Sequence, residues 1–498
     1  MSEPIARRKA LTDYRIAVTQ CQLCGRVYFP PKSFCDREGR ESRMMRKDYF
    51  YSKGSFVSGA VINIPTNRFK HLDAYVSGIV DFAEDGFRVP GRVTDLVPSE
   101  GGLKTTELIG REVVPRFRKT YVDGEDGLVY YSSLNFSLID DYYPYQQHAT
   151  LTPSREIEKP GIVGYGVYLP KFRIKNENEV LGVKERTLPF ADEDTTSFSV
   201  EAGKRALIHA GISSADVKKC FVGSESPPYA VKPAMATVCQ ALKLGEEYEG
   251  GFFSGGTDSQ FACKAASDLF IDAVALVGYP VFDGEYVLVI GADNSQAAPG
   301  DALDFTVGAG AAAYLFGKHD VIATIDCYVP YTSDTPDFYR RDGEKYPRHG
   351  GRFTGEPAYY KHVLTAMEAA LKKTGLSPRD ISYVATHSPN GTFPYRAALQ
   401  VGFQKEQIEP GLVVTMIGNL YSGSCLTGLA AVLDIAKPED RILLTSYGSG
   451  AGSESYLLTV TEHIEEKRSR QVTLKDQIYN PHRQYVDYST YRRWKEIS

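Results

Sequence analysis

The sequence predicts an α/β protein in which a large layered core follows a small antiparallel β-barrel. From residue 161 onward, short apolar runs that end in small residues alternate with segments of helical period, a pattern that favours helices packed on buried sheets. Over residues 43–145, β-branched and aromatic residues recur at alternate positions between Gly- and Asp-containing turns, which indicates a small barrel. The length of 498 residues accommodates a core of about 250–300 residues and an appended module.

Composition excludes several classes of protein. Apolar residues make up 42% and charged residues 24%, so the chain is not largely disordered. A net charge of −5 without a basic run argues against nucleic-acid binding, and eight cysteines are too few for a disulfide scaffold. The first residues lack the apolar run of a signal peptide, and the most apolar stretch, 269–282, is too short to span a membrane. We expect a cytoplasmic protein that binds neither nucleic acid nor membrane.

Changes in composition divide the chain into six segments. They are a cysteine-containing hook (1–42), the barrel (43–145), a proline-containing linker (146–160), two halves of the core (161–320 and 321–462) and a polar tail (463–498). The tail holds four tyrosines and the only tryptophan, Trp494, among basic residues. Such residues suit an interface with a neighbouring subunit, and a frayed end is the alternative.

The core contains seven predicted strands and four predicted helices. The strands are IVGYGVYLP, KKCFVGSES, YVLVIGAD, AAAYLFG, ISYVATHSP, LVVTMIGN and RILLTSYGSG. The helices are TTSFSVEAGKRALIHAG, FACKAASDLFIDAVALVG, YYKHVLTAMEAALKKTG and CLTGLAAVLDIAK. The two halves repeat this alternation without visible residue identity.

One cysteine is a candidate nucleophile. In GGTDSQFACKAASDLF, residues 255–257 are expected to form a loop, and Cys263 is expected in the first turn of a helix. The unpaired N–H groups and the macrodipole at that position favour a thiolate, which is the nucleophilic form. The alternative is a small buried apolar residue, the role we expect of Cys220, Cys239 and Cys327.

Polar residues at other strand ends could complete an acyl-transfer site. His387 and Asn419 each follow a predicted strand, and Glu225 lies in a turn after another, where a carboxylate can act as a general base or acid. The Gly-Ser-Gly turn around Ser449 offers backbone N–H groups for an oxyanion. Each signal alone is weak, but four strand-end signals in one α/β domain indicate a shared cleft.

These residues lie in strings that resemble the thiolase superfamily, and within it the archaeal type of 3-hydroxy-3-methylglutaryl-CoA synthase. The resemblance covers about residues 161–460 in the family's order. The matching strings are ADEDTTSFSVEA, VGSESPPYAVKP, QFACKAA, GADNSQAAPGDALDFTVGAGAAA, SDTPDFYRRDGEKYPRHGGRFTGEPAYYKHV, HSPNGTFP, GNLYSGS and YGSGAGS.

The resemblance implies a duplicated βαβαβαββ core in five layers, normally a homodimer, that makes 3-hydroxy-3-methylglutaryl-CoA from acetyl-CoA, acetoacetyl-CoA and water. It implies that Cys263 carries the acetyl group and that Glu225 deprotonates the acetyl methyl. His387 and Asn419 would hold the acetoacetyl carbonyls, and the N–H groups of Cys263 and Ser449 would form the oxyanion hole. CoA enters as part of the substrates, and the chemistry requires no other cofactor. The mevalonate pathway and a catabolic route both remain open.

A glutamate base separates this reaction from its relatives. Decarboxylating ketoacyl synthases need no carboxylate base, and thiolases use a second cysteine. Cys425 follows Asn419 closely, but we expect it in the first turn of a structural helix. Tyr421 and Asp293 are further candidates for shaping the site. Two alternatives remain: a ketoacyl-synthase III-like or β-branching acyltransferase with another acyl donor or acceptor, and a silent scaffold subunit for a thiolase.

The N-terminal segment, including CQLCGRVYFPPKSFC, resembles the zinc-ribbon and OB-fold proteins that accompany thiolases and archaeal synthases. The resemblance covers about residues 10–140 and implies a module that helps to bind CoA and bridges to a thiolase. Cys21, Cys24 and Cys35 supply three thiolates, and Glu38 occupies the position expected for a fourth. A site of three cysteines and Glu38, a ligand from elsewhere and a metal-free hook all remain open.

Basic residues surround the predicted barrel and could meet the phosphates of CoA. A solvated face is the alternative for each one. These residues are Arg43, Arg46, Lys47, Arg68, Lys70, Arg116, Arg118 and Lys119.

Overall fold

The computed structural model describes residues 12–39, 41–69, 72, 74–96, 102–122, 129–139, 159–282, 285–335, 337–341, 343–349 and 354–497. The chain forms two compact units. The first comprises Met1–Tyr145, Phe190–Ser197 and Arg493–Ser498, and the second comprises Gln146–Pro189 and Phe198–Arg492. Most of the predicted linker lies outside the described residues, and the predicted domain boundaries stay predictions.

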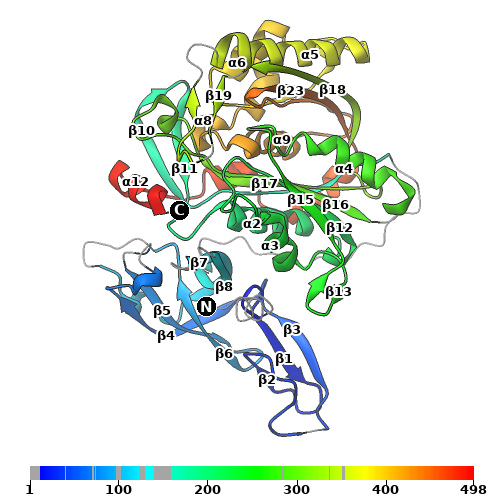
Figure 1. Ribbon diagram of the computed structural model, residues 1–498. Coiled ribbons are helices and arrows are strands. Elements are labelled where there is room, and N and C mark those ends of the chain that lie inside the picture. The colour runs from blue at the N-terminus through cyan, green and yellow to red at the C-terminus, as the bar shows by residue number, and fades with distance from the viewer. Residues whose placement is uncertain are drawn as a thin grey trace. The chain divides into compact units, whose positions relative to one another are not determined.

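The first unit contains a small antiparallel sheet and a closed barrel (Figure 1). The sheet has the order β2-β1-β3 and the barrel the order β4-β5-β6-β8-β7, which confirms the predicted ribbon-like hook and OB-type barrel. Phe56, Val80, Val89 and Phe136 are buried in the barrel core. The strands are β1 (Ala17–Cys21), β2 (Val27–Tyr28), β3 (Met44–Asp48), β4 (Gly54–Ile62), β5 (Tyr75–Phe82), β6 (Phe87–Val93), β7 (Glu112–Val122) and β8 (Val129–Leu138).

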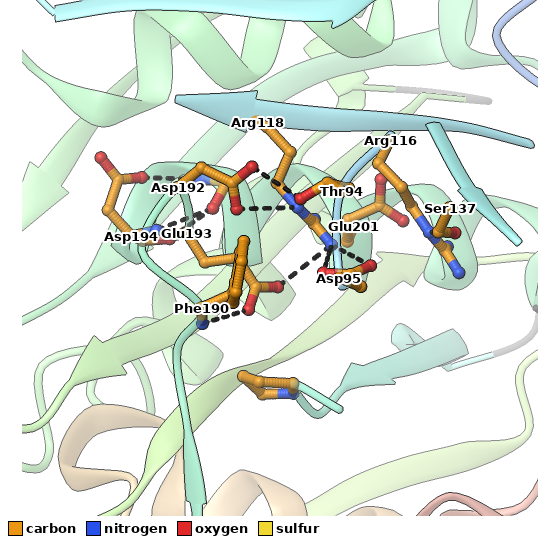
Figure 2. A network of polar contacts seen from close by, with 12 residues as sticks. Thr94, Asp95, Arg116, Arg118, Ser137, Phe190, Asp192, Glu193, Asp194 and Glu201 are labelled. Carbon is orange, nitrogen blue, oxygen red and sulfur yellow. Dashed lines mark hydrogen bonds and ion pairs between the residues drawn. The ribbon is translucent and has the colours of Figure 1, made fainter. Parts of the chain in front are cut away.

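Three of the basic residues expected around the barrel are buried. Figure 2 shows Arg118 among carboxylates, with Asp95 at 3.2 Å and Glu193 at 3.3 Å. Arg116 and Lys119 are each 4% exposed. The expectation of CoA phosphates or a solvated face is therefore wrong for these three, because charged pairs inside the unit occupy Arg118 and burial removes all three from solvent. Lys70 and the side chain of Arg68 lie outside the described residues.

The second unit is built on nine strands in the order β15-β12-β16-β17-β9-β18-β23-β22-β21. The central strands β9, β16 and β17 are buried along their whole length, which explains their continuous apolar sequence. The strands are β9 (Gly161–Tyr168), β12 (Val217–Gly223), β15 (Gly255–Ser259), β16 (Tyr286–Asn294), β17 (Ala309–Gly317), β18 (Ala323–Thr335), β21 (Tyr383–Thr386), β22 (Arg441–Thr445) and β23 (Gly450–Val460).

Strand order reveals the duplication that residue identity conceals. The first half has the spatial order of its third, second, fourth, fifth and first strands, from β15 to β9. The second half has its first strand, β18, followed by β23, β22 and β21, which repeats the same order in reverse without an equivalent of β15. The halves join where β9 and β18 pair through two residue pairs.

Helices cover and separate the strands of the second unit. Figure 1 shows α2 and α3 on one outer face, α5 and α6 on the opposite face, and α4 and α9 between the halves. Phe270 of α4 and Leu429 of α9 belong to one buried cluster with residues from both halves, so the predicted five-layered core is confirmed. The helices are α2 (Thr195–Ala210), α3 (Ala234–Leu242), α4 (Leu269–Gly278), α5 (Tyr360–Thr374), α6 (Phe393–Val401), α7 (Lys405–Ile408), α8 (Val414–Ile417) and α9 (Ser424–Leu433).

Two local predictions are wrong. LVVTMIGN forms the short helix α8, which packs against β11 (Val183–Leu188). Residues 255–257 form the start of the edge strand β15 because their backbone pairs with β12, although two glycines in succession are typical of a loop. Other short strands of this unit are β10 (Phe172–Val180), β13 (Glu247–Tyr248), β14 (Gly251–Phe252), β19 (Phe338–Tyr339), β20 (Arg348–His349) and β24 (Gln484–Tyr485).

The tail is folded. It forms α10 (His463–Lys467), α11 (Leu474–Ile478), β24 and α12 (Tyr488–Ile497). Tyr491 is 2% exposed, because it packs within its own chain, and the alternative of a frayed end is wrong. In the described part of the chain, no helix is both long and apolar enough to cross a membrane.

Candidate active site

Cys263 lies in a tight turn between β15 and α4. The N–H of Lys264 donates to the carbonyl of Phe261 at 3.1 Å, and Ala262 has a φ of 45°. Helix α4 begins only at Leu269, so the predicted position in the first helical turn is wrong. The turn buries Cys263, which is 6% exposed.

Glu225 follows β12, and its carboxyl group lies near enough to the Cys263 thiol for each group to shift the pKa of the other. Burial, and next the charge of Glu225, raise the pKa of Cys263 well above its usual value. The expected preference for a thiolate is therefore wrong, because Cys263 lies outside the helix and both burial and a neighbouring carboxylate disfavour the charged form. Burial, and then Asp293, raise the pKa of Glu225 to about 8. In the resting site, a neutral thiol thus faces a carboxyl group that titrates near neutrality.

Asp293, at the end of β16, organises the loop that carries Glu225. Its carboxylate accepts hydrogen bonds from the N–H of Glu225 at 2.9 Å and from the hydroxyls of Ser224 at 2.8 Å and Ser226 at 2.6 Å. It also accepts from the N–H of Ser422 at 2.9 Å. Burial raises its pKa to about 6, against these hydrogen bonds. The carboxylate therefore fixes Glu225 relative to the loop that follows Asn419.

Asn419 follows α8 and not a strand, which corrects the predicted context of this residue. It is held by backbone hydrogen bonds with the 306–308 segment: its N–H donates to Thr306 at 2.7 Å, and its carbonyl accepts from Gly308 at 2.8 Å. Its side-chain oxygen accepts from the N–H of Tyr421 at 2.9 Å. Tyr421 and Val307 belong to a buried cluster with Cys263. Asn419 contacts both of these residues and is therefore connected to the nucleophile through them.

His387 directly follows β21, as predicted, and is 1% exposed. Burial lowers its pKa to about 3, so the imidazole is neutral. Its Nδ1 atom is buried and has no hydrogen-bond partner in the described part of the chain. The Tyr447 ring lies 6.2 Å from the imidazole, and Tyr447 also interacts electrostatically with Cys263. His387 therefore reaches the vicinity of Cys263 through Tyr447.

Ser449 lies at the tip of a loop that packs against the nucleophile's turn. Gly448 and Gly452 exchange backbone hydrogen bonds of 2.8 Å across this loop. A Cβ atom on Gly448 would lie 2.5 Å from the carbonyl oxygen of Phe261. Only glycine permits this approach, and the loop therefore comes close to both sides of Cys263.

Several residues around this loop were not predicted from the sequence. Asp337 is wholly buried and accepts from the Tyr447 hydroxyl at 2.7 Å and from the N–H of Gly450 at 2.8 Å. Lys264 forms a buried ion pair with Glu454 and another with Asp268 at 2.7 Å. Both Asp337 and Lys264 lie in strings that carry the family resemblance, and that context was the available signal.

Cys425 has the structural role expected of it. It lies in the first turn of α9 and is wholly buried in the main core. Burial raises its pKa to about 12, which disfavours a thiolate. The second cysteine is therefore part of the packing between the two halves.

A cavity of about 200 Å³ opens beside this cluster. Ala262, which precedes the nucleophile, lines it together with Glu225, Tyr421, Arg340 and Phe338. The Glu225 Oε1 and Ser422 Oγ atoms are buried and lack hydrogen-bond partners within the described residues. Buried polar atoms are normally paired, so these atoms are available to a bound molecule.

The ribbon cysteines also gather as predicted. The Sγ atoms of Cys21, Cys24 and Cys35 lie within 4.8 Å of one another, and the carboxylate of Glu38 is not part of this group. Burial opposes ionisation of Cys35, but hydrogen bonds from Tyr28 and from backbone N–H groups lower its pKa to about 6. Three converging thiols, one of them readily ionised, fit the donor chemistry of a zinc ion.

Two halves of one duplicated core meet around a buried cysteine, and this arrangement defines a protein of the thiolase-like fold. Among solved structures, MvaS in complex with 3-hydroxy-3-methylglutaryl coenzyme A has a TM-score of 0.61 at 21% identity, over 68% of this chain and 91% of that chain. The HMG synthase of the curacin biosynthetic pathway, in complex with holo donor-ACP, has a TM-score of 0.60 at 20% identity, over 68% and 88%.

Sequence relatives identify the family within that class. The hydroxymethylglutaryl-CoA synthase of Methanothermobacter thermautotrophicus is 46% identical over 348 residues, which cover 67% of this chain and 98% of the relative. The enzyme of the same name from Methanopyrus kandleri is 44% identical over 352 residues, covering 68% and 98%. The chain belongs to the hydroxymethylglutaryl-CoA synthase family. Residues 8–38 match the family model described as ChsH2, rubredoxin-like zinc ribbon domain.

Proposed function

We propose that the protein condenses acetyl-CoA with acetoacetyl-CoA and hydrolyses the adduct to 3-hydroxy-3-methylglutaryl-CoA and CoA. The pairing of the Cys263 thiol with a Glu225 carboxyl of pKa about 8 carries this proposal. An acetyl methyl group is a weak acid, and a general base works best when its pKa lies near the operating pH. Decarboxylative condensation would need no such base.

In the first step, the Cys263 sulfur attacks the carbonyl carbon of acetyl-CoA. The thiol proton passes to Glu225, the new S–C bond forms, and the bond to CoA sulfur breaks. The departing CoA thiolate takes that proton, which leaves Glu225 as the carboxylate. The backbone N–H groups of Cys263 and Ser449 stabilise the oxyanion, a role for which the close approach of the Gly448 loop gives support.

In the second step, Glu225 removes a proton from the acetyl methyl, and the resulting carbanion attacks the ketone carbon of acetoacetyl-CoA. His387 and Asn419 hold the acceptor carbonyls, and the proton held by Glu225 neutralises the new alkoxide. Water then attacks the thioester, the S–C bond to Cys263 breaks, and the sulfur regains a proton. Tyr421 and Asp293 keep the reacting groups in register through their contacts with Asn419 and Glu225.

The test is turnover of purified protein with both thioesters, monitored by loss of the acetoacetyl enolate absorbance and by mass analysis of the product. We expect 3-hydroxy-3-methylglutaryl-CoA only when both substrates are present, and none from the Cys263→Ser variant. Parallel reactions offer the acetyl group on CoA and on an acyl carrier protein. Turnover confined to the carrier-bound donor would replace the proposal with a β-branching enzyme. Absence of any acetyl-enzyme would favour a scaffold.

The ribbon is proposed to hold one structural zinc ion through Cys21, Cys24 and Cys35. Bound zinc would cross-link the turns of the hook and stabilise the fold of this small sheet. Glu38 and a ligand from elsewhere both remain candidates for the fourth position. We expect about one zinc per chain in purified protein and loss of zinc in Cys24→Ser, whereas less than about 0.2 zinc per chain would contradict the site.

Further proposals concern assembly and location. Strand β15 pairs with β12 on one side, and residues 255–257 are exposed, so a second copy could pair with its other edge to form a homodimer. The N-terminal module is proposed to associate with a thiolase that supplies acetoacetyl-CoA, on the basis of the ribbon resemblance. The eight free cysteines support a cytoplasmic location. Light scattering of the purified protein and co-purification with a thiolase test the two assemblies.

A further inference from the structure

The C-terminal helix α12 is joined to a buried carboxylate near the proposed active site. Asp304, in the 3-10 helix η6 (Ala302–Phe305), is wholly buried. Its carboxylate accepts hydrogen bonds from the hydroxyl of Tyr488 and, at 2.7 Å, from that of Tyr491. The guanidinium of Arg492 lies 3.6 Å from the same carboxylate. Three side chains from about one and a half turns of α12 therefore converge on the carboxylate of Asp304.

Helix η6 is directly connected to the segment that holds Asn419. The N–H of Val307 donates to the carbonyl of Leu303 at 3.0 Å, and Val307 pairs with Asn419. Leu303 also packs against the buried cluster that contains Cys263. A displacement of Asp304 would therefore reach Asn419 through a few backbone hydrogen bonds.

Helix α12 is also joined to the segment that contains Pro347, a residue that lines the cavity. Arg492 donates to the Tyr346 hydroxyl at 3.1 Å, and Tyr346 precedes Pro347, which lines the cavity. His349 of β20 lies 3.6 Å from Asp301 at the start of η6. Helix η6 and the segment of Pro347 are thus linked to each other and to α12.

We infer that Tyr488, Tyr491 and Arg492 are positioning residues that clamp the segment of Asn419 and the segment of Pro347 beside the acyl cavity. This inference rests on the proposed roles of Asn419 and Cys263. The clamp acts on the segment of Asn419, and so it matters most for the step in which the acceptor carbonyls must be aligned. Misplacement of a reacting group by about 1 Å can cost about 10²-fold in rate. Formation of the acetyl-enzyme, which uses the turn of Cys263, depends less on the clamp.

The test uses the full chain with Tyr488→Phe and Tyr491→Phe, singly and together. Each change removes one hydroxyl and keeps the ring, and Tyr479→Phe, which alters an exposed tyrosine of the same tail, is the matched control. We expect hydrogen–deuterium exchange to accelerate in peptides covering residues 300–308 and 417–421 of the double variant. We expect kcat for condensation to fall about tenfold or more, with acetylation of Cys263 within about twofold of the unaltered protein. The control, Tyr479→Phe, is expected to change neither the exchange rates nor the kcat for condensation.

Unaltered exchange in both peptides would overturn the clamp, and so would an equal loss of acetylation and condensation, which indicates a purely structural role. If the double variant does not fold, the single variants decide in the same way. Failure of the proposed function is distinguishable, because the unaltered protein would then not turn over acetoacetyl-CoA. The exchange measurement requires no substrate and still reports whether α12 holds η6 and the segment of Asn419.

Discussion

The two halves of the duplicated core differ in the chemistry of the residues that we propose for the active site. The first half contributes Cys263 and Glu225, an ionisable pair in which burial raises the pKa of both members. The second half contributes His387, whose pKa burial lowers to about 3, and the uncharged Asn419. One half is therefore suited to move protons and the other to donate hydrogen bonds without charge. The two halves of the duplicated fold therefore share a backbone arrangement but differ in the charge properties of the residues that they contribute.

The largest expected effect comes from removing the base. Glu225→Ala is expected to leave acetylation of Cys263 measurable and to lower condensation by about 10³-fold or more, since general bases contribute about 10²–10⁴-fold. Labelled acetyl-CoA measures the first step, and single-turnover product formation measures the second.

Glu225→Gln is the matched variant, because it keeps the shape of the side chain without a basic form. It is expected to condense no better than the alanine variant. Loss of acetylation together with condensation would show that Glu225 is required already in the first step, and its assignment as the base needed chiefly for condensation would fail.

In the second half, a neutral hydrogen-bond donor is expected to replace His387 in part. His387→Ala should slow condensation by about 10²-fold, the usual cost of losing one hydrogen-bond donor to a developing negative charge. His387→Asn retains a neutral donor and should recover part of that loss, unlike Glu225→Gln. Single-turnover rates at saturating acetoacetyl-CoA make the comparison. Equal rates for the alanine and asparagine variants would contradict the hydrogen-bonding role.

Strand-end chemistry was predictable from sequence, and the conformation around it was not. Glu225 and His387 follow β12 and β21 as predicted, because apolar runs that end in polar turns mark strand ends. The turn of Cys263 was mistaken for a helix start, since the helical spacing of α4 continues upstream of its hydrogen-bonded residues. The α8 segment was mistaken for a strand because a short apolar run does not distinguish the two.

The electrostatics of the site could not be predicted either. The raised pKa of Cys263 depends on burial and on Glu225, which lies 38 positions earlier in the sequence. Asp337 was missed for the same reason, because its partners Tyr447 and Gly450 are distant in the chain. Contacts between segments far apart in sequence determine these properties, and local spacing contains little information about them.

The pH dependence of condensation should distinguish the halves in a milder way. In the proposed mechanism Glu225 acts as the carboxylate, and burial raises its pKa to about 8, so the rate of the second step should rise with pH and level off above that value. Below it, the slope approaches about tenfold per unit. Titration of His387 should not change the rate of condensation near pH 6–7, because burial lowers its pKa to about 3. Stopped-flow measurements on preformed acetyl-enzyme test this, and a rate that falls as the pH rises from 6 to 8 would contradict the assignment of the base.

The smallest expected effect is on stability. Burial raises the pKa of Glu225 from 4.5 to about 8 in the folded state, so the folded protein holds this proton more tightly than the unfolded chain does. The free energy of unfolding therefore decreases as the pH rises from the unfolded pKa to the folded one, and then stays level.

Glu225→Gln removes this penalty because its side chain does not ionise. The variant should unfold at a temperature a few degrees higher than the unaltered protein at pH 9 and at nearly the same temperature at pH 4.5. Thermal unfolding across this range measures the difference, with His387→Asn as the control that shows no such pH trend. If the unfolding temperatures of the variant and the unaltered protein differed by the same amount at every pH, ionisation of Glu225 would not be the cause of the difference. Burial of this base in the first half would then not destabilise the folded protein.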